Sequence, residues 1–518
     1  MWFGKLFIII TMIFQFSCNK QSTIGPYGED FFNKNELSHL NLDISVKLAQ
    51  TKNGQPRLII EESFNPVREY MGIQLPNNFM RQKNLFELVE NLQADNADII
   101  EHSTIPFVKL LKTNKKKVTL RYAIKPFIEE NFTSPIIKND YFQFVGSMAL
   151  INFIALEPET NFDVNFNWQL PKEFQIFNSF TYNKESHKQN LSLNKLWDSL
   201  FIAGSNLRAF SININNNPVY TIFNGYWDKM KDEDLLVTIK KLITTQRNTW
   251  QDNDFPYFLI SFLSLEKDCN AKVQYAGTAH QNSFRAYFPK ACPLMSEMYE
   301  LISHELMHVW IGKKIVFGKE RGKIDGKWFS EGFCDYYGRL MSYRSGLISE
   351  DMYFNSLNRE IESYFLSSAL NTSLYELVDR MYKENSNADL EKLPYQQGEL
   401  VALELNKLIK NNSNQRYSLD DPIKDMIKEA NNSNGYKNFA LSDIKNIFNK
   451  YLSNNAIDNF LHKIEKGEPI IPTKFPGCKD LIIKNRPLFR RTINYTNNPI
   501  FYYKDSIYDN ETCAKWLE

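Results

Sequence analysis

Residues 301–310 read Leu301-Ile-Ser-His-Glu-Leu-Met-His-Val-Trp310, with His304 and His308 four positions apart and Glu305 directly after the first histidine. Residues four apart lie on one face of an α-helix, so both imidazoles can direct a nitrogen at one metal ion. Glu305 projects beside that position, where a carboxylate can take a proton from a bound water. A separate apolar stripe follows the same helical spacing: Met298, Ile302, Leu306 and Val309. The pattern predicts a helix over 296–311, buried on one face and metal-binding on another.

A second helical segment follows, Lys327-Trp-Phe-Ser-Glu-Gly-Phe-Cys-Asp-Tyr-Tyr-Gly338. Catalytic zinc takes three protein ligands and keeps a fourth position open, and Glu331 is the predicted third ligand. Asp335 lies one turn later and is predicted to accept a hydrogen bond from the outer nitrogen of His304, which fixes the tautomer. A solvated helix carboxylate is the alternative for Asp335. The segments together predict one zinc ion per chain.

The composition bounds the remaining possibilities. At 518 residues the chain is long enough for roughly three domains. Its 61 Lys and Arg residues nearly balance 60 Asp and Glu residues, and no basic arm or acidic tail occurs. We therefore expect no nucleic-acid partner.

The N-terminus is typical of an export signal. Lys5 precedes an apolar run over 6–16 that is too short to span a bilayer. The following Ser17 and Cys18 resemble the lipobox of bacterial lipoproteins, although Gln15 stands where an aliphatic residue is usual. We expect residues 1–17 to be a signal peptide, Cys18 to be acylated and 18–34 to be a tether; the alternative is a plain signal peptide. The predicted location is a bacterial membrane, in the periplasm or on the cell surface, with the lipid anchor as the only membrane attachment.

Export permits disulfides, and five cysteines follow Cys18. Their positions favour the pairs Cys269–Cys292 and Cys478–Cys513, although other pairings stay open. Those pairs would leave Cys334 without a partner, beside the proposed metal site.

Period-two patterns dominate the first third of the chain and helical patterns the rest. Predicted strands cover 40–48, 57–61, 117–124, 141–154 and 161–169. Predicted helices cover 232–251, 296–311, 328–343 and 395–410, with a further strand over 257–265. The tail after Pro469 and Pro472 is predicted to hold strands and turns. The expected class is a multidomain α+β protein.

These motifs resemble the gluzincin metallopeptidases, and among them the glycyl aminopeptidase family that often carries a PDZ domain. The matching residues of the two helical segments are His304, Glu305, His308, Trp310, Trp328, Phe329, Glu331, Gly332, Phe333, Tyr336 and Tyr337. The stretches 275–283 and 394–403 match the family in outline, upstream and downstream of the metal motif.

The resemblance implies a function and a domain plan. It implies a peptide or protein substrate and an oxyanion-stabilising hydroxyl on Tyr395, for which a packing role is the alternative. It implies substrate-binding positions at Gly277, His280 and Asn282. The implied plan is a β-sandwich-like N-terminal domain over 35–185, a thermolysin-like catalytic domain over 186–400, a helical region over 401–470 and a tail over 471–518.

Two departures from the family bear on function. About 45 residues follow the helical region, too few for a PDZ domain, so we expect none there. The family's glutamate, which in related aminopeptidases binds the free α-amino group of the substrate, is Ala279 here. An aminopeptidase is the first hypothesis. An endopeptidase on the same site and a non-catalytic peptide-binding lipoprotein with a relict zinc site are the alternatives.

Overall fold

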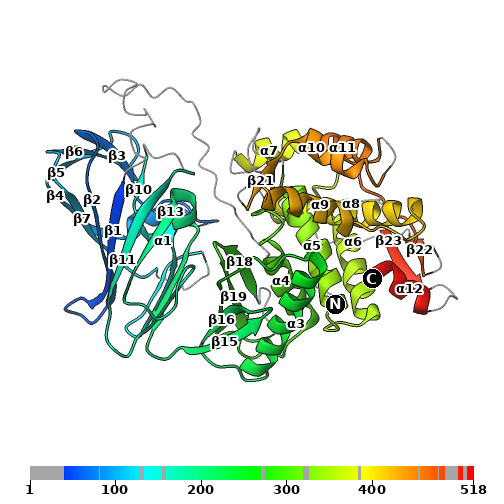
Figure 1. The fold of residues 1–518 in the computed structure, drawn as a ribbon, viewed down its shortest axis with the longest axis horizontal. Coiled ribbons are helices and arrows are strands. Elements are labelled where there is room, and N and C mark those ends of the chain that lie inside the picture. Colours follow the sequence, from blue (N-terminus) through cyan, green and yellow to red (C-terminus); the bar gives the residue numbers. More distant parts are fainter. Residues whose placement is uncertain are drawn as a thin grey trace. The chain divides into compact units, whose positions relative to one another are not determined.

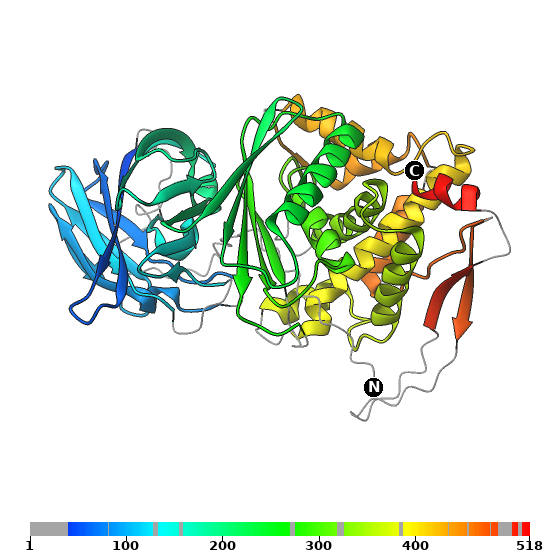
Figure 2. The same ribbon diagram turned by 90° about the horizontal axis from the view of Figure 1, so that it is seen from below.

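A computed structural model gives the fold as two compact units, Met1–Asp228 with Phe255–Ala291, and Lys229–Asp254 with Cys292–Glu518 (Figures 1 and 2). The described residues are 40–80, 82–127, 133–154, 159–269, 275–318, 326–382, 387–433, 435–452, 455–476, 478–484, 500–505 and 510–518. The predicted signal peptide, Cys18 and the tether lie outside them.

The first unit contains a six-stranded sheet in the order β13-β11-β1-β2-β7-β4. Its strands are β13 (Ser186–Ser192), β11 (Asn161–Gln169), β1 (Asn41–Gln50), β2 (Pro56–Phe64), β7 (Val118–Ile124) and β4 (Val89–Asp95). Buried residues alternate with partly buried ones along β2 and with partly buried or exposed ones along β11, so one face packs against the core. β1 runs parallel to β11 and antiparallel to β2.

Two four-stranded sheets complete the β-rich part of this unit, ordered β10-β3-β6-β5 and β12-β14-β9-β8. Their strands are β10 (Asn152–Phe153), β3 (Tyr70–Gln74), β6 (Val108–Thr113), β5 (Ala97–Glu101), β12 (Gln175–Asn178), β14 (Leu200–Gly204), β9 (Tyr141–Val145) and β8 (Ile136–Ile137). The short helices α1 (Gly146–Ala149) and α2 (Leu193–Trp197) and the 3-10 helix η3 (Leu85–Leu88) lie in connections between strands of this unit.

One carboxylate lies in the core of this unit. Glu62 on β2 is fully buried, and its Oε1 accepts hydrogen bonds from the Ile151 amide at 2.9 Å and from the Tyr122 hydroxyl. Burial raises the pKa of Glu62 to about 7, although both hydrogen bonds favour the charged form.

The last sheet of the first unit has the order β15-β16-β17-β19-β18. Its strands are β15 (Arg208–Ile214), β16 (Asn217–Asn224), β17 (Phe258–Leu265), β19 (Ser283–Pro289) and β18 (Ala276–His280). β16, β17 and β19 are parallel neighbours, whereas the edge strand β18 is antiparallel to β19. Between β16 and β17 the chain enters the second unit.

The second unit is mainly helical (Figure 2). Its helices are α3 (Asp232–Trp250), α4 (Ser296–Met307), α5 (Lys327–Arg344), α6 (Glu350–Phe365), α7 (Leu374–Tyr382), α8 (Ala388–Asn412), α9 (Asp420–Asn431), α10 (Leu441–Phe448), α11 (Ala456–Lys466) and α12 (Asn510–Leu517). Two small strand pairs accompany them, β20 (Ile315–Phe317) with β21 (Lys437–Phe439) and β22 (Lys479–Lys484) with β23 (Ile500–Asp505). The predicted α+β multidomain class is confirmed. Within the described residues, no helix has the length and apolarity that a membrane crossing needs.

The cysteines follow the predicted scheme where it can be compared. Cys478 and Cys513 are joined by a disulfide. Cys269 and Cys292 are each disulfide-bonded. Cys334 is a free and buried thiol, as expected.

Candidate metal centre and active site

Two histidines of α4 form the first part of the site. His304 lies in the last turn of α4, and His308 caps the helix with φ −59° and ψ −17°, which are still helical values. The spacing of one turn is therefore kept, and both side chains lie on one face. Their Nε2 atoms are 3.0 Å apart, and each residue is only 1% exposed.

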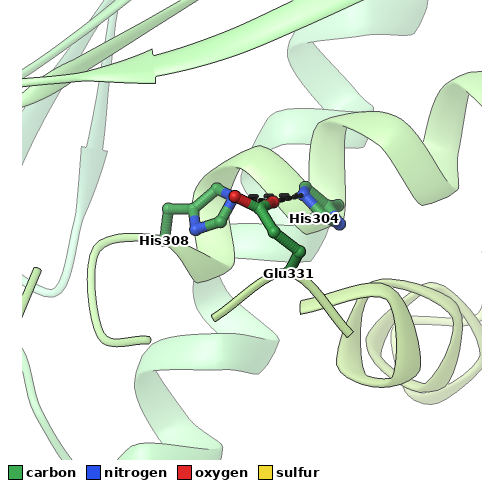
Figure 3. Close-up of side chains that lie close together, drawn as sticks. All are labelled: His304, His308 and Glu331. Carbon is green, nitrogen blue, oxygen red and sulfur yellow. Dashed lines mark hydrogen bonds and ion pairs between the residues drawn. The ribbon is translucent and has the colours of Figure 1, made fainter. Parts of the chain in front are cut away.

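Glu331 of α5 completes the cluster (Figure 3). Its Oε2 lies 3.5 Å from Nε2 of His304 and 3.4 Å from Nε2 of His308. The three potential ligand atoms all lie within 4.8 Å of one another, and all three residues are buried. Two imidazoles and one carboxylate are a donor set that suits catalytic zinc.

The outer nitrogens of the two histidines are held by hydrogen-bond acceptors. Nδ1 of His304 lies 2.7 Å from Oδ1 of Asp335, and Nδ1 of His308 lies 3.1 Å from the Ile311 carbonyl oxygen. A carboxylate and a carbonyl only accept, so both Nδ1 atoms carry a proton, and each ring offers its Nε2 lone pair once a metal ion displaces any proton there. Two lone pairs and a carboxylate oxygen then converge on one point. A cation there would relieve their repulsion, so the residues fit a bound metal ion.

The electrostatics of the cluster also favour a positive charge. Burial lowers the pKa of His304, but Asp335, Glu331 and Glu305 outweigh it and raise the pKa to about 10. Burial raises the pKa of Glu331, but the imidazoles of His308 and His304 lower it to about 2. Anionic groups therefore surround the point where the three side chains meet.

Glu305 is completely buried on α4, adjacent to His304. Its carboxylate is close enough to the cluster to contribute to the raised pKa of His304. A buried carboxylate at this place can exchange a proton with a group bound between the histidines and Glu331.

Tyr395 reaches the cluster from α8. Its ring lies nearly parallel to that of His304, with centroids 6.3 Å apart and an interplanar angle of 16°, and the residue is 9% exposed. Three residues later, Gly398 meets Gly332 of α5. A Cβ built on Gly398 would lie 1.6 Å from the Trp328 carbonyl oxygen and 2.9 Å from the Gly332 Cα. Only glycine allows this approach of α8 to α5, which brings Tyr395 beside the cluster of His304, His308 and Glu331.

The predicted substrate-binding positions belong to the other compact unit. Gly277 and His280 lie on β18, and Asn282 occupies the following turn with a φ of 46°. Nδ1 of His280 lies 3.2 Å from Oδ1 of Asp198, so this ring has a structural contact within its own unit. Ala279 is buried on the same strand.

Several contributors to the site were missed from the sequence. The Ile311 carbonyl is a backbone group, for which no sequence signal exists. Cys334, by contrast, was predicted to lie beside the metal site, and its Sγ is 3.4 Å from Nδ1 of His308. Asp252, at the end of α3, accepts hydrogen bonds from Trp310 Nε1 at 2.9 Å and Lys314 Nζ at 2.6 Å, which holds the segment after His308. Trp310 was visible in the motif, but its distant acceptor was not.

Comparisons with known proteins agree with this geometry. Residues 297–401 match the family model of the M61 glycyl aminopeptidases, a range that contains the three clustered ligands, Glu305 and Tyr395. No curated protein matches the chain.

Solved structures share the fold. An aminopeptidase N family protein from Idiomarina loihiensis superposes with a TM-score of 0.69 and 16% identity, over 86% of this chain and 79% of that one. An M1 zinc metallopeptidase from Deinococcus radiodurans gives a TM-score of 0.50 and 11% identity, over 84% of this chain and 94% of that one. With its M61 match and its fold, the chain is a peptidase that resembles the glycyl aminopeptidases.

Proposed function

We propose that this peptidase is a zinc-dependent aminopeptidase. The observation that carries the proposal is the convergence of two imidazole Nε2 atoms and one carboxylate, with both outer nitrogens already held by acceptors. The zinc metallopeptidase from Deinococcus radiodurans shares the fold and so supports the choice of metal.

His304, His308 and Glu331 would hold the ion, one per chain. Zinc at such a site polarises a carbonyl group and lowers the pKa of water. Asp335 and the Ile311 carbonyl keep the two rings in the tautomer that binds metal. These contacts also fix the ring orientations before any ion arrives.

Glu305 and Tyr395 perform the remaining steps. Glu305 accepts a proton from the attacking water and then donates it to the leaving amine. The Tyr395 hydroxyl donates a hydrogen bond to the oxyanion of the tetrahedral intermediate, a charge that exists only during reaction. An intact Glu305 argues against a pure binding protein, which has no use for a general base.

Metal analysis together with the Glu305→Gln variant tests this proposal. Wild-type protein should contain about one zinc per chain. Glu305→Gln should keep that zinc but lose nearly all hydrolysis of a peptide pool, because an amide cannot accept the proton. His304→Ala should lose the metal. Full zinc content in His304→Ala, or full activity in Glu305→Gln, would contradict the proposal.

Ala279 favours an endopeptidase as the second candidate. In the resembling family a glutamate at this position binds the substrate amine, whereas Ala279 offers only a methyl group. An exopeptidase here requires another acid for that amine. We also propose, from the lipobox-like residues before it, that Cys18 carries a lipid anchor on an exported protein.

A further inference from the structure

Helix α5 approaches α4 and α8 closely at two glycines, Gly338 and Gly332, which have no side chain to hold the helices apart. A Cβ built on Gly338 of α5 would lie 3.1 Å from the Glu300 carbonyl oxygen and 3.2 Å from Cβ of His304, both on α4. The contact of Gly332 with Gly398 joins α5 to α8 in the same way. The metal ligands and Tyr395 lie on these three helices, so small sliding of one helix would displace site residues.

A buried arginine links the same three helices. Arg339 of α5 is 4% exposed and forms ion pairs with Glu399 of α8 and, at 3.6 Å, with Glu300 of α4. Both carboxylates are buried, and Ser356 of α6 donates a hydrogen bond to Glu300 at 2.8 Å. One guanidinium thus lies between two carboxylates in a place that water does not reach.

Each member of this network lies one helical turn from a residue of the site. Glu300 precedes His304 by four residues, and Arg339 follows Asp335 by four. Glu399 likewise follows Tyr395 by four residues. Residues four apart share a helix face, so the network repeats the contacts of the site one turn away. The Arg339–Glu399 ion pair therefore holds α8 at a fixed position along the axis of α5.

We propose that Arg339 is a positioning residue, which places Tyr395 beside His304 by holding Glu399 of α8. Glu300 orients the guanidinium from α4, and the planar fork of arginine can contact two carboxylates at once. This inference rests on the proposed function, because it assigns Tyr395 the oxyanion-stabilising role. Buried ion pairs often add little net stability. Positioning α8 relative to α5 is therefore a function that this ion pair can serve without stabilising the fold.

The chain offers a matched control on the same helix. Arg344 of α5 forms a partly buried ion pair with Asp420 at 2.7 Å and donates a hydrogen bond to the Leu517 carbonyl at 2.8 Å. Its ion pair is with α9, and on α8 its charge acts at Lys410, fifteen residues after Tyr395. Its replacement disturbs a similar ion pair of α5 but leaves the placement of Tyr395 intact.

The test is a double-mutant cycle between Arg339 and Tyr395. Arg339→Lys keeps the charge but cannot reach both carboxylates in a fork. It should lower kcat roughly 10- to 100-fold, with KM and zinc affinity within about threefold of wild type. In the Tyr395→Phe background, Arg339→Lys should cause no further loss of kcat, because the two residues act as one unit. Arg344→Lys should keep wild-type kcat.

Three results would overturn the inference: unchanged kcat in Arg339→Lys, a full additional loss in the Tyr395→Phe background, or an equal loss in Arg344→Lys. Glu399→Gln provides a second variant, since it keeps the side-chain volume but not the charge, and it should show the same non-additivity with Tyr395→Phe. Zinc affinity, measured by competition with a chelating dye, is the readout independent of activity. Full activity of Tyr395→Phe alone would instead remove the proposed role of Tyr395.

Discussion

Two buried carboxylates of this chain, Glu331 and Glu62, have opposite pKa shifts because of their neighbours. Burial raises the pKa of both. At Glu331 the imidazoles of His308 and His304 outweigh burial and lower the pKa to about 2. At Glu62 only hydrogen bonds from Tyr122 and Ile151 oppose burial, and the pKa is about 7. The first arrangement suits a metal ligand, whereas the second makes stability depend on pH.

Glu62 should make the first unit less stable as pH rises. Its pKa in the folded state lies above its ordinary value of 4.5, so folding favours the protonated form. That contribution is fully present below about pH 4.5 and is lost as pH rises through about 7, at roughly 3 kcal/mol for a shift of this size. Glu62→Gln should remove the dependence. Hydrogen exchange of β2 and β7 at pH 5 and pH 8, corrected for intrinsic rates, measures it; an equal pH dependence in Glu62→Gln would contradict the assignment.

The residues that could be predicted from the sequence were those whose chemistry follows from spacing. Helical geometry predicted that His304 and His308 share a face, whereas Glu331 on the next helix was assigned from the three-ligand rule for catalytic zinc and from the resembling motif. Glu62 and the Ile311 carbonyl were not predicted. The partners of Glu62, Tyr122 and Ile151, lie 60 and 89 residues away in the sequence. The Ile311 carbonyl is only three residues from His308, but it is a backbone group whose direction no side-chain pattern specifies.

At the scale of elements, the crossing of α5 and α8 determines how close Tyr395 lies to His304. Both helices were predicted in outline, as 328–343 and 395–410, and the structure has Lys327–Arg344 and Ala388–Asn412. Period-3.6 patterns give the helices but not their separation, which depends on the glycine contact. The predicted strand 141–154 is instead β9, α1 and β10, and the C-terminal helix α12 was not predicted.

Gly398→Ala should separate α8 from α5. The new methyl group would collide with the Trp328 carbonyl, at a cost of about 1–3 kcal/mol or more. We expect a lower melting temperature and, because Tyr395 moves with α8, a lower kcat with zinc retained. Gly346→Ala is the control: its φ is 67° and its Cβ meets nothing within 4 Å. It should lose some stability but no turnover. Equal turnover in the two variants would show that the crossing does not position Tyr395.

At the scale of the whole molecule, the two compact units are not contiguous in sequence. Residues 229–254 leave the first unit to form α3, and the chain returns for β17. The predicted contiguous domains, with limits at residues 185 and 400, came from the period-two pattern and from the family resemblance. Neither shows what the buried face of a helix packs against. The predicted limits stay predictions, and the one at 400 falls inside α8.

The enzyme should select for a free peptide N-terminus less strictly than related aminopeptidases do. A buried α-ammonium without a carboxylate costs several kcal/mol, and Ala279 supplies none. N-acetylation should therefore slow cleavage less than it does in related aminopeptidases. An acetylated peptide cleaved within about tenfold of the rate of the free peptide would favour the endopeptidase candidate. Paired assays with and without a chelator measure this. A loss of a hundredfold or more on acetylation would mean that another acid of the chain binds the amine.

Acylation of Cys18 gives a second test at this scale. A diacylated mature N-terminus anchors the whole protein to a membrane, because two acyl chains give stable membrane binding, whereas a single acyl chain binds only weakly. Mass spectrometry of the membrane fraction should find Cys18 as the modified first residue. Cys18→Ala should release the protein into the soluble fraction; an unmodified N-terminus at another residue would contradict the anchor.

The glycine contact between Gly332 and Gly398 also has a genetic consequence. Any missense change at a glycine codon introduces a Cβ, and neither position has room for one. Under selection for function, both codons should therefore tolerate only silent changes, whereas the codon of Gly54, whose surroundings are open, is limited only by its backbone conformation. Mutational drift in descendants of this gene would leave an unchanging pair of glycines 66 positions apart, so the helix crossing is recorded in the genes as two codons that vary only silently.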